Sequence, residues 1–246
     1  MNTAIRLEPR VAAIIGALVA DAAALGLHWL YDTERIAQIE KTKGLVFLPP
    51  SADDYSGVSG YFAHGKKQAG DSSAYGELCL LMLRHIARHG RFYRMDYQAE
   101  YRSYFGPGGG YQGYIDSPTR QTLQTLLPLK PEDFPLQSGA DDDQFAALAA
   151  LPAIVATHQE SQDALKAKIE QVVRLTNHND TAVAAAQYAG CVLLAVLNGQ
   201  PIQQALADSL PHAGEKLRPL LEEALQVKTL DCAAVAKRFG NACHVP

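Results

Sequence analysis

Apolar residues recur at every third or fourth position along almost the whole chain. Near the N-terminus, Val11, Ile14, Ile15, Leu18 and Val19 fall on one face of a helix. No stretch alternates cleanly between apolar and polar residues, as a half-buried strand would. The spacing therefore predicts an all-α fold, a single orthogonal bundle of about ten helices. A length of 246 residues can form one such domain, and we expect residues 1–246 to do so.

Caps and breakers give the bounds of the expected helices. Gly44 and Gly90 are typical helix stops, and Ser72 or Ser73, Ser117-Pro118 and Ser161 are typical helix starts. We expect helices over 9–25, 33–41, 73–89, 97–105, 117–127, 143–156, 161–175, 181–197, a short stretch from 201, 216–226 and 231–239. Residues 45–70, rich in proline and glycine, are expected to form a long loop with a functional role.

Charge and cysteine usage narrow the classes of protein. The net charge is −4 and the longest basic run is Lys66-Lys67, so we expect no nucleic-acid partner. The apolar stretch at 11–31 contains Asp21, which favours a buried helix over a membrane span or a signal peptide. The four cysteines have no zinc-finger spacing, and we expect a reducing, cytoplasmic setting.

Asp21 is the most informative carboxylate, because it stands among alanines in an apolar helix. A buried carboxylate needs a partner or a ligand, so Asp21 either belongs to a site or caps a neighbouring helix. His28, Trp29, Tyr31 and Asp32 follow closely. This cluster predicts a small-ligand pocket, with interfacial core aromatics as the alternative.

Further oxygen-rich positions lie at predicted helix starts. Asp71, Ser72 and Ser73 form a corner that suits a hard cation, although simple N-capping explains the same residues. The same two interpretations apply to Asp141–Asp143 and to His178-Asn179-Asp180. The run Gly106–Gly110 follows an aromatic helix and favours a connecting turn over a phosphate loop.

Several short motifs together resemble a known family. The run from Gly16 to Gly26 resembles the opening helix of the ADP-ribosylglycohydrolase superfamily, and Leu175–Asp180 with its following alanines resembles a second motif. The stretch Leu27–Asp32, with Ser73–Gly76 and Gly110–Asp116, is similar to the branch that contains the jellyfish J-type crystallins. The resemblance covers most of the chain and implies an all-α fold.

The resemblance also implies an activity and a set of site residues. Active members cleave the bond that joins ADP-ribose to a protein side chain or small molecule, and they depend on magnesium. Carried over to this chain, Asp21 and Asp71 would be catalytic, and Asp71, Ser72 and Ser73 would hold the metal. The expected ligand-binding residues are His28, Trp29, Tyr111 and Tyr114, with the two tyrosines stacking on adenine or ribose.

This chain departs from the family pattern where the metal should bind. Ser73-Ala74-Tyr75-Gly76 stands in place of a Thr-Asp-Asp-Thr motif, and His28 stands in place of a glutamate. A later Asp-Thr-Asp motif has no counterpart before Pro246, so we expect the C-terminal part of the family fold to be missing. The helices left uncovered would favour self-association or a partner.

Three functions follow from these observations. The first is an ADP-ribosylglycohydrolase-like hydrolase with a degenerate magnesium site, acting on ADP-ribose or an ADP-ribosylated substrate. The second is a catalytically inactive, crystallin-like binding or structural homologue, which the replacements at Ala74 and Tyr75 favour. The third is an unrelated helical adaptor.

Overall fold

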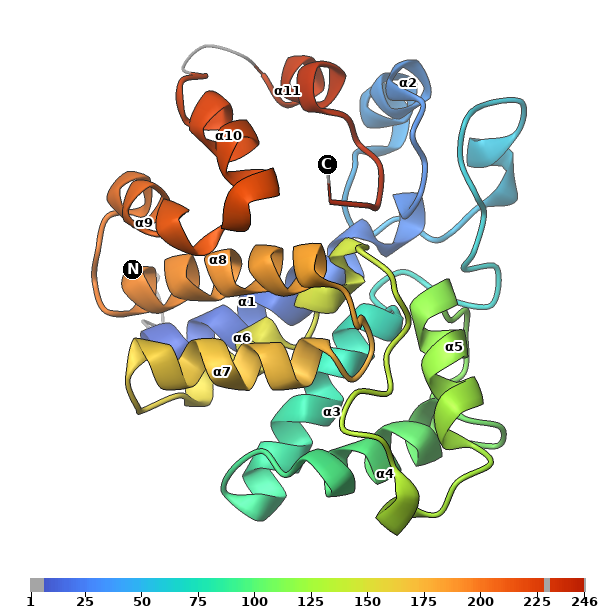
Figure 1. The fold of residues 1–246 in the computed structure, drawn as a ribbon. Coiled ribbons are helices and arrows are strands. Elements are labelled where there is room, and N and C mark those ends of the chain that lie inside the picture. The colour runs from blue at the N-terminus through green and yellow to red at the C-terminus, as the bar shows by residue number, and fades with distance from the viewer. Residues whose placement is uncertain (1–6, 228–230, 246) are drawn as a thin grey trace.

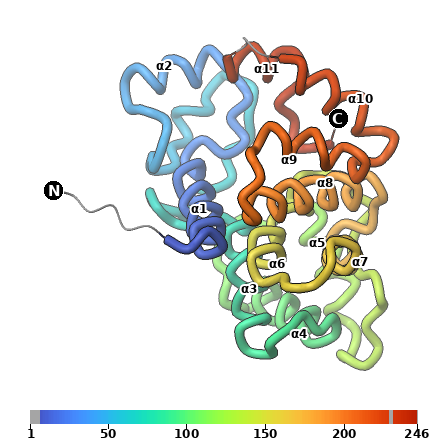
Figure 2. Tube along the Cα trace, turned by 90° about the vertical axis from the view of Figure 1, so that its left-hand side faces the viewer, coloured from blue at the N-terminus to red at the C-terminus, as the bar shows by residue number. Residues whose placement is uncertain are grey.

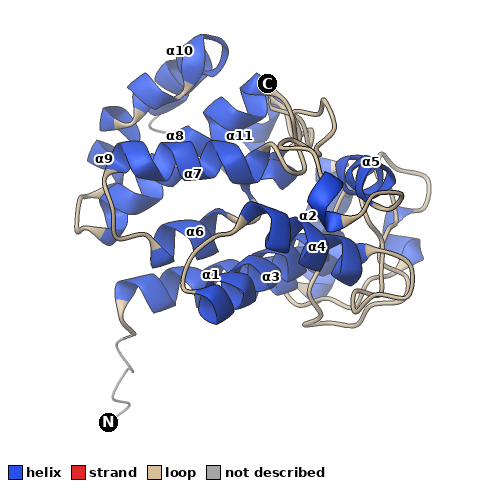
Figure 3. Cartoon of the chain, turned by 60° about the horizontal axis from the view of Figure 1, so that its bottom comes forward, coloured by secondary structure: helices blue, strands red, loops and turns tan. Residues whose placement is uncertain are grey.

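The computed structural model describes residues 7–227 and 231–245. Within these ranges it contains eleven α-helices and no strands, which confirms the predicted all-α class (Figure 3). The helices are α1 (Pro9–Ala24), α2 (Thr33–Lys43), α3 (Ala74–His89), α4 (Arg94–Phe105), α5 (Ser117–Leu126), α6 (Leu151–Thr157), α7 (Gln162–Val173), α8 (Asp180–Leu197), α9 (Ile202–Asp208), α10 (Gly214–Leu225) and α11 (Cys232–Phe239).

Most predicted helix ends are confirmed within a few residues. Ser73 accepts a hydrogen bond from the Tyr75 amide at the start of α3, and Gly90 ends that helix with a left-handed φ of 74°. The side chain of Ser161 accepts the amide of Ala164 and caps α7, as predicted. The cap of α5 is Asp116, one residue before the predicted Ser117-Pro118 pair.

The predicted helix over 143–156 is wrong in its first half. The α-helix begins only at Leu151, and a short 3₁₀ turn, Phe145–Leu148, precedes it. The amide of Phe145 donates to the carbonyl of Cys243, and that of Gln144 to the Asp142 carboxylate. These long-range and side-chain bonds replace the helical bonds that an apolar run alone would predict.

Helix α6 lies at the centre of the molecule. It packs against α1, α3, α7 and α8, and Ala153, Ile154 and Val155 in it are almost fully buried. Figure 1 shows α7 and α8 side by side, and Figure 2 shows α6 between α1 and α7. The main core is continuous around α6, and two smaller clusters lie under α9–α10 and under the long loop.

The loop from residue 45 to 73 covers the end of α1 and the following 3₁₀ turn, Leu25–Leu27. Leu30 and Ile39 pack against Leu48 of this loop, and Leu30 pairs with Gly60 in an isolated antiparallel bridge. The loop is thus tied to the residues that follow α1, which brings two parts of the predicted pocket together.

Two helical stretches, Pro9–Leu27 and Asp180–Leu197, are long and apolar enough to cross a membrane by length and composition. In the second stretch 44% of the window is buried. In the first only 11% is buried and α1 has no buried residue, so the prediction of a buried helix there is wrong. Val11, Ile15 and Val19 line the exposed side of α1. The prediction that the chain has no membrane partner stays a prediction.

Candidate functional site

The carboxylate of Asp21 caps the neighbouring helix α3. Its Oδ2 accepts the amide of Ser73 at 2.8 Å, and its Oδ1 accepts the Ser73 hydroxyl at 2.5 Å. Burial raises the pKa of Asp21, and the two bonds from Ser73 oppose that rise. The structure thus shows the contacts that the cap interpretation requires, and the catalytic role of Asp21 stays a prediction.

The start of α3 is packed closely onto this carboxylate. A Cβ atom at Gly76 would collide with Asp21 Oδ2, so any larger residue at this position would require the carboxylate to shift. Asp71 lies just before the helix, where its Oδ2 accepts the amide of Gln68 at 2.8 Å. The hydroxyl of Ser72 also lies close to the position that a Cβ atom on Gly76 would occupy. Both oxygens of Asp21, Oδ2 of Asp71 and the hydroxyl of Ser73 are thus engaged by the protein itself.

His28 pairs with a histidine from the long loop. Its Nδ1 lies 2.7 Å from Nε2 of His64, and the two rings are stacked with centroids 4.9 Å apart. Burial lowers the pKa of both imidazoles to about 4, with His64 adding to the effect on His28 and Lys67 to that on His64. Both rings are therefore neutral at pH 7, and one donates its N–H to the other.

Trp29 has a backbone conformation that side chains rarely adopt, with a φ of 64°. The carbonyl of Trp29 accepts the amide of Tyr61 at 3.0 Å, and the hydroxyl of Tyr55 donates to the carbonyl of His28 at 2.8 Å. These bonds hold the strained residue, and strain of this kind is concentrated at functional sites. The indole contacts His28, Tyr61 and Tyr114.

The two tyrosines predicted to stack on a ligand have different surroundings. Tyr114 is half-buried and meets Trp29 edge-on, with ring centroids 5.1 Å apart. Tyr111 is buried, its hydroxyl donates to the Tyr114 carbonyl, and Lys67 lies over its ring. Arg120 lies over the ring of Tyr114 at 5.8 Å, so the rings of both tyrosines have a cationic neighbour, and their stacking roles stay predictions.

Two cavities meet at His28 and Tyr75. One, the α1 cavity, has a volume of about 380 Å³ and is lined by Asp21, Ala24, Leu25, Leu27, His28, Ile36, Leu45, Ser73 and Tyr75. The other, the C-terminal cavity, has a volume of about 370 Å³ and is lined by His28, Trp29, Tyr31, Tyr75, Gln144, Phe145, Ala146, Leu148, Ala149, Asn241 and Cys243. Burial and the carboxylate of Asp116 raise the pKa of Tyr75, so its phenol is neutral.

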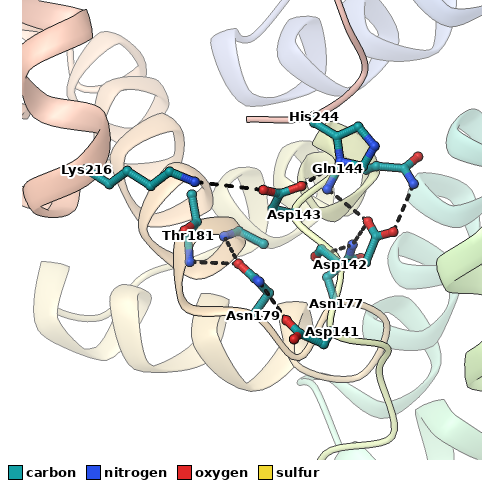
Figure 4. Close-up of polar contacts among 10 residues, drawn as sticks. Asp141, Asp142, Asp143, Gln144, Asn177, Asn179, Thr181, Lys216 and His244 are labelled. Atoms are coloured by element: carbon teal, nitrogen blue, oxygen red, sulfur yellow. Dashed lines mark hydrogen bonds and ion pairs between the residues drawn. The ribbon is translucent and has the colours of Figure 1, made fainter. Parts of the chain in front are cut away.

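A network of polar side chains holds the wall of the C-terminal cavity (Figure 4). Asp142 accepts from the side chains of Gln144 and Asn177, and Asn179 Nδ2 donates to Asp141 at 2.7 Å. The Nδ1 atom of His244 lies 2.6 Å from Oδ1 of Asp143. The acidic run and the Asn177–Asn179 segment thus serve to fasten two loops to each other, and Asn179 also caps α8.

One group of side chains in the described ranges has the geometry to hold a metal ion: His85, His89 and Glu100, whose ligand atoms lie within 4.8 Å of one another. The Tyr93 amide donates to Nε2 of His85, so in neutral His85 the ring proton is on Nδ1, which faces Glu100. A cation would have to displace this proton. The group is about 18 Å along α3 from Ser73, at 1.5 Å per residue.

Another cavity, of about 560 Å³, is lined by polar residues that include Arg10, His158 and Gln162. The guanidinium of Arg10 donates there to the carbonyls of Val155, Ala156 and His158, which end α6. Because this charge already serves to stabilise a helix end, the cavity is a weaker site candidate than the two around His28.

Three residues that lie around His28 were not predicted from the sequence. His64 belongs to the long loop, where only the loop's length suggested a function. Gln144 stood inside a wrongly predicted helix, and Asn241 lies 210 positions from Tyr31, whose carbonyl it contacts. No local pattern could have placed these side chains beside His28.

Comparison with known proteins agrees with the motifs and the fold. A model of the ADP-ribosylglycohydrolase family matches residues 3–244. Crystallin J1A of Tripedalia cystophora is 28% identical over 252 residues, which cover 96% of this chain and 73% of that protein. Crystallin J1B of the same organism is 30% identical over 191 residues, covering 72% of this chain and 54% of that protein. Because the family model matches nearly the whole chain and the fold is all-α, the chain belongs to the ADP-ribosylglycohydrolase family.

Proposed function

We propose that this protein binds ADP-ribosyl ligands at the cavities around His28 without hydrolysing them. The observation that carries the proposal is the state of Asp21: both of its carboxylate oxygens are bonded to Ser73 at the start of α3. Each oxygen is thereby engaged by one donor from Ser73, which leaves the carboxylate fewer acceptor positions for a cation or a water molecule.

Members of this family depend on a metal ion, and the residues predicted to hold magnesium do not fit one here. Magnesium requires about six oxygens in near-octahedral geometry. The Ser73 hydroxyl donates to Asp21 and accepts the amide of Tyr75, while Asp71 is bonded to its own loop. The position of Tyr75 beside His28 adds an aromatic ring and no charge.

The aromatic side chains support binding of a nucleotide-like ligand. Trp29, Tyr61 and Tyr114 form a cluster with ring centroids 5.1 to 5.9 Å apart, and Tyr61 is 55% exposed. Exposed aromatic faces suit adenine or ribose. The two relatives are crystallins, which also favours a role without catalysis. We also propose that the protein is soluble in a reducing cytoplasm, which agrees with its four free cysteines. We propose no nucleic-acid or membrane partner.

The test combines binding and turnover. Calorimetric titration with ADP-ribose should give saturable binding that chelators do not change, and an ADP-ribosylated protein substrate should release no ADP-ribose with magnesium or manganese. Tyr114→Leu should weaken binding several-fold, whereas Tyr93→Leu, at the N-cap of α4, should not. Metal-dependent release would overturn the proposal in favour of a hydrolase, and absence of binding would overturn it as well.

A further inference from the structure

A further cavity, of about 470 Å³, is formed by the start of α4, the loop that follows Phe134 and one side of α7. It is lined by Arg94, Leu136, Gln137, Ala167, Glu170, Gln171 and Arg174. We call it the α4–α7 cavity. It shares no lining residue with the α1 cavity or the C-terminal cavity, so it is separate from the surroundings of His28.

The guanidinium of Arg94 is held in place through one of its three nitrogens. Its Nη1 donates to the side-chain oxygen of Gln98 at 2.7 Å and to the carbonyls of Pro135 and Phe134 at 3.0 and 3.4 Å. Within the described ranges, the Nε–H and Nη2–H groups have no hydrogen-bond acceptor. Neither nitrogen is buried away from solvent. One whole edge of the guanidinium is therefore available to a ligand.

The charge of Arg94 has no counter-ion, whereas that of Arg174 has two. Nε of Arg174 lies 2.8 Å from Glu170, and its Nη2 lies 2.7 Å from Asp180. Glu170 is the one acidic residue in the cavity lining, and this ion pair already engages it. In the part of the chain that the structure describes, no carboxylate lies within ion-pair distance of Arg94. The cavity therefore has one unpaired positive charge.

The available edge of Arg94 suits a carboxylate. Two parallel N–H groups in the plane of a guanidinium match the two oxygens of a carboxylate, and such bidentate pairs are among the strong hydrogen bonds. Since the contacts of Nη1 already fix the orientation of the group, less side-chain entropy is lost on binding. A carboxylate brings one negative charge, whereas a phosphate would bring a second one close to Glu170.

The walls of the cavity favour an aliphatic chain on that carboxylate. Leu136 is 74% exposed, and Ala167 of α7 lines the same cavity. The methylene groups of Gln137 and Gln171 add aliphatic surface. A hydrocarbon chain that covered these groups would remove apolar area from water. No aromatic ring lines the cavity, so nothing in it favours a planar ligand.

We propose that the α4–α7 cavity binds a small aliphatic carboxylate, of the class of medium-chain fatty acids. The carboxylate accepts the Nε–H and Nη2–H groups of Arg94, and the chain packs against Leu136 and Ala167. This inference does not rest on the proposed function, because the two sites have no residue in common.

Three matched probes test the two parts of the ligand. Octanoate carries both the charge and the chain, 1-octanol carries the chain alone, and acetate carries the charge alone. In ¹⁵N-labelled protein, octanoate should shift the amide resonances of residues 94–96, 136–138 and 167–174 saturably. Octanol and acetate should each bind at least tenfold more weakly, because one lacks the charge-assisted bonds and the other lacks the apolar contacts.

One pair of variants isolates the guanidinium edge. Arg94→Lys keeps the positive charge but has no planar pair of donors, so octanoate should bind at least fivefold more weakly and octanol about as before. Arg91→Lys is the control, because Arg91 is an exposed arginine in the same segment that does not line the cavity.

A second pair isolates the apolar wall. Leu136→Asn should weaken octanoate binding three- to tenfold and leave acetate binding unchanged. Leu127→Asn is the control, because Leu127 is an exposed leucine outside the cavity lining. Leu136 is exposed, so its variant keeps the test valid even if Arg94→Lys loosens the loop at Pro135.

Equal affinity for octanoate and octanol, or for octanoate and acetate, overturns the inference. Octanoate binding that neither variant weakens, or shifts confined to other parts of the molecule, overturns it as well. The result is independent of the titration with ADP-ribose. Octanoate binding that depends on Arg94, in a protein that does not bind ADP-ribose, would support this inference and reject the proposed function. ADP-ribose binding without octanoate binding would do the reverse.

Discussion

The carboxylate of Asp21 shows how one side chain can look catalytic in sequence and act as a cap in the structure. Its two oxygens accept both hydrogen bonds that Ser73 can donate, across 52 residues of sequence. The burial that made Asp21 conspicuous among alanines is the same property that makes its partner necessary.

Replacing Asp21 should cost stability before it costs any activity. In Asp21→Ala the amide and hydroxyl of Ser73 lose their acceptors, and we expect the free energy of unfolding to fall by about 1–3 kcal/mol. Urea denaturation followed by circular dichroism measures this change. Asp53→Ala, at an exposed position of the long loop, is the control and should differ little from the parent chain. A loss in Asp21→Ala no larger than in the control would contradict the cap.

The histidine pair makes a prediction about acid. His28 and His64 have a pKa of about 4 when folded and about 6.5 when unfolded, so the unfolded chain binds more protons between these values. The stability that the neutral pair contributes is complete above pH 6.5 and is lost as the pH falls towards 4. From pH 7 to pH 5 we expect a loss of roughly 1–2 kcal/mol per histidine.

A pH series of urea denaturations checks this expectation. His64→Phe removes one of the two titrating rings and should flatten the dependence of stability on pH between 6.5 and 5. His178→Gln, which changes an exposed loop histidine, should leave the slope as it is. An unaltered slope in His64→Phe would show that the pair is not the source of the acid sensitivity.

One long side chain adds hydrogen bonds to the packing contact between α1 and α6. Arg10 reaches from the first turn of α1 to three carbonyls at the end of α6, with distances of 2.7 to 3.3 Å. The carbonyl of Val155 also accepts the amide of His158, and all three carbonyls lie at the negative end of the helix dipole. The two helices are therefore joined by a charge as well as by packing.

Removing that charge should loosen the end of α6. We expect Arg10→Met, which keeps most of the aliphatic stem, to lower the free energy of unfolding by about 1.5–3 kcal/mol. Hydrogen exchange of the amides in 151–161 should accelerate locally. The comparison is Lys41→Met on the exposed side of α2. Unchanged exchange in that segment would indicate that Arg10 is merely a surface residue.

The molecule as a whole is organised around α6, with α1 at its edge. Ile154 of α6 is 1% exposed, whereas Val19 of α1 is 49% exposed although both belong to strongly apolar helices. Hydropathy alone gives these two residues the same expected environment. Their difference arises from which helices pack on which side.

This contrast can be measured with two truncations of similar chemistry. Ile154→Ala creates a cavity among α1, α3 and α8 and should cost about 2–5 kcal/mol. Val19→Ala removes mostly exposed surface and should change stability by less than about 0.5 kcal/mol. Equilibrium unfolding in urea distinguishes the two, and equal losses would mean that α1 is covered on both sides in solution.

What the sequence determined is local. The three-to-four-residue period, the caps at Ser73, Ser161 and Asp231 and the stop at Gly90 are set by backbone hydrogen bonding within a few positions, so the helices could be predicted. The motifs also identified the family. The helix expected over 143–150 failed because its backbone bonds to Cys243, about a hundred positions away.

The site was decided by the tertiary structure. Asp21 with Ser73, His28 with His64 and Asn241 with Tyr31 are separated by 52, 36 and 210 positions. Whether such groups meet depends on how whole helices pack, and the packing energy is spread over many residues that carry no local signature. A sequence therefore reveals which side chains could do chemistry, and only their arrangement shows that Asp21 accepts both donors of Ser73.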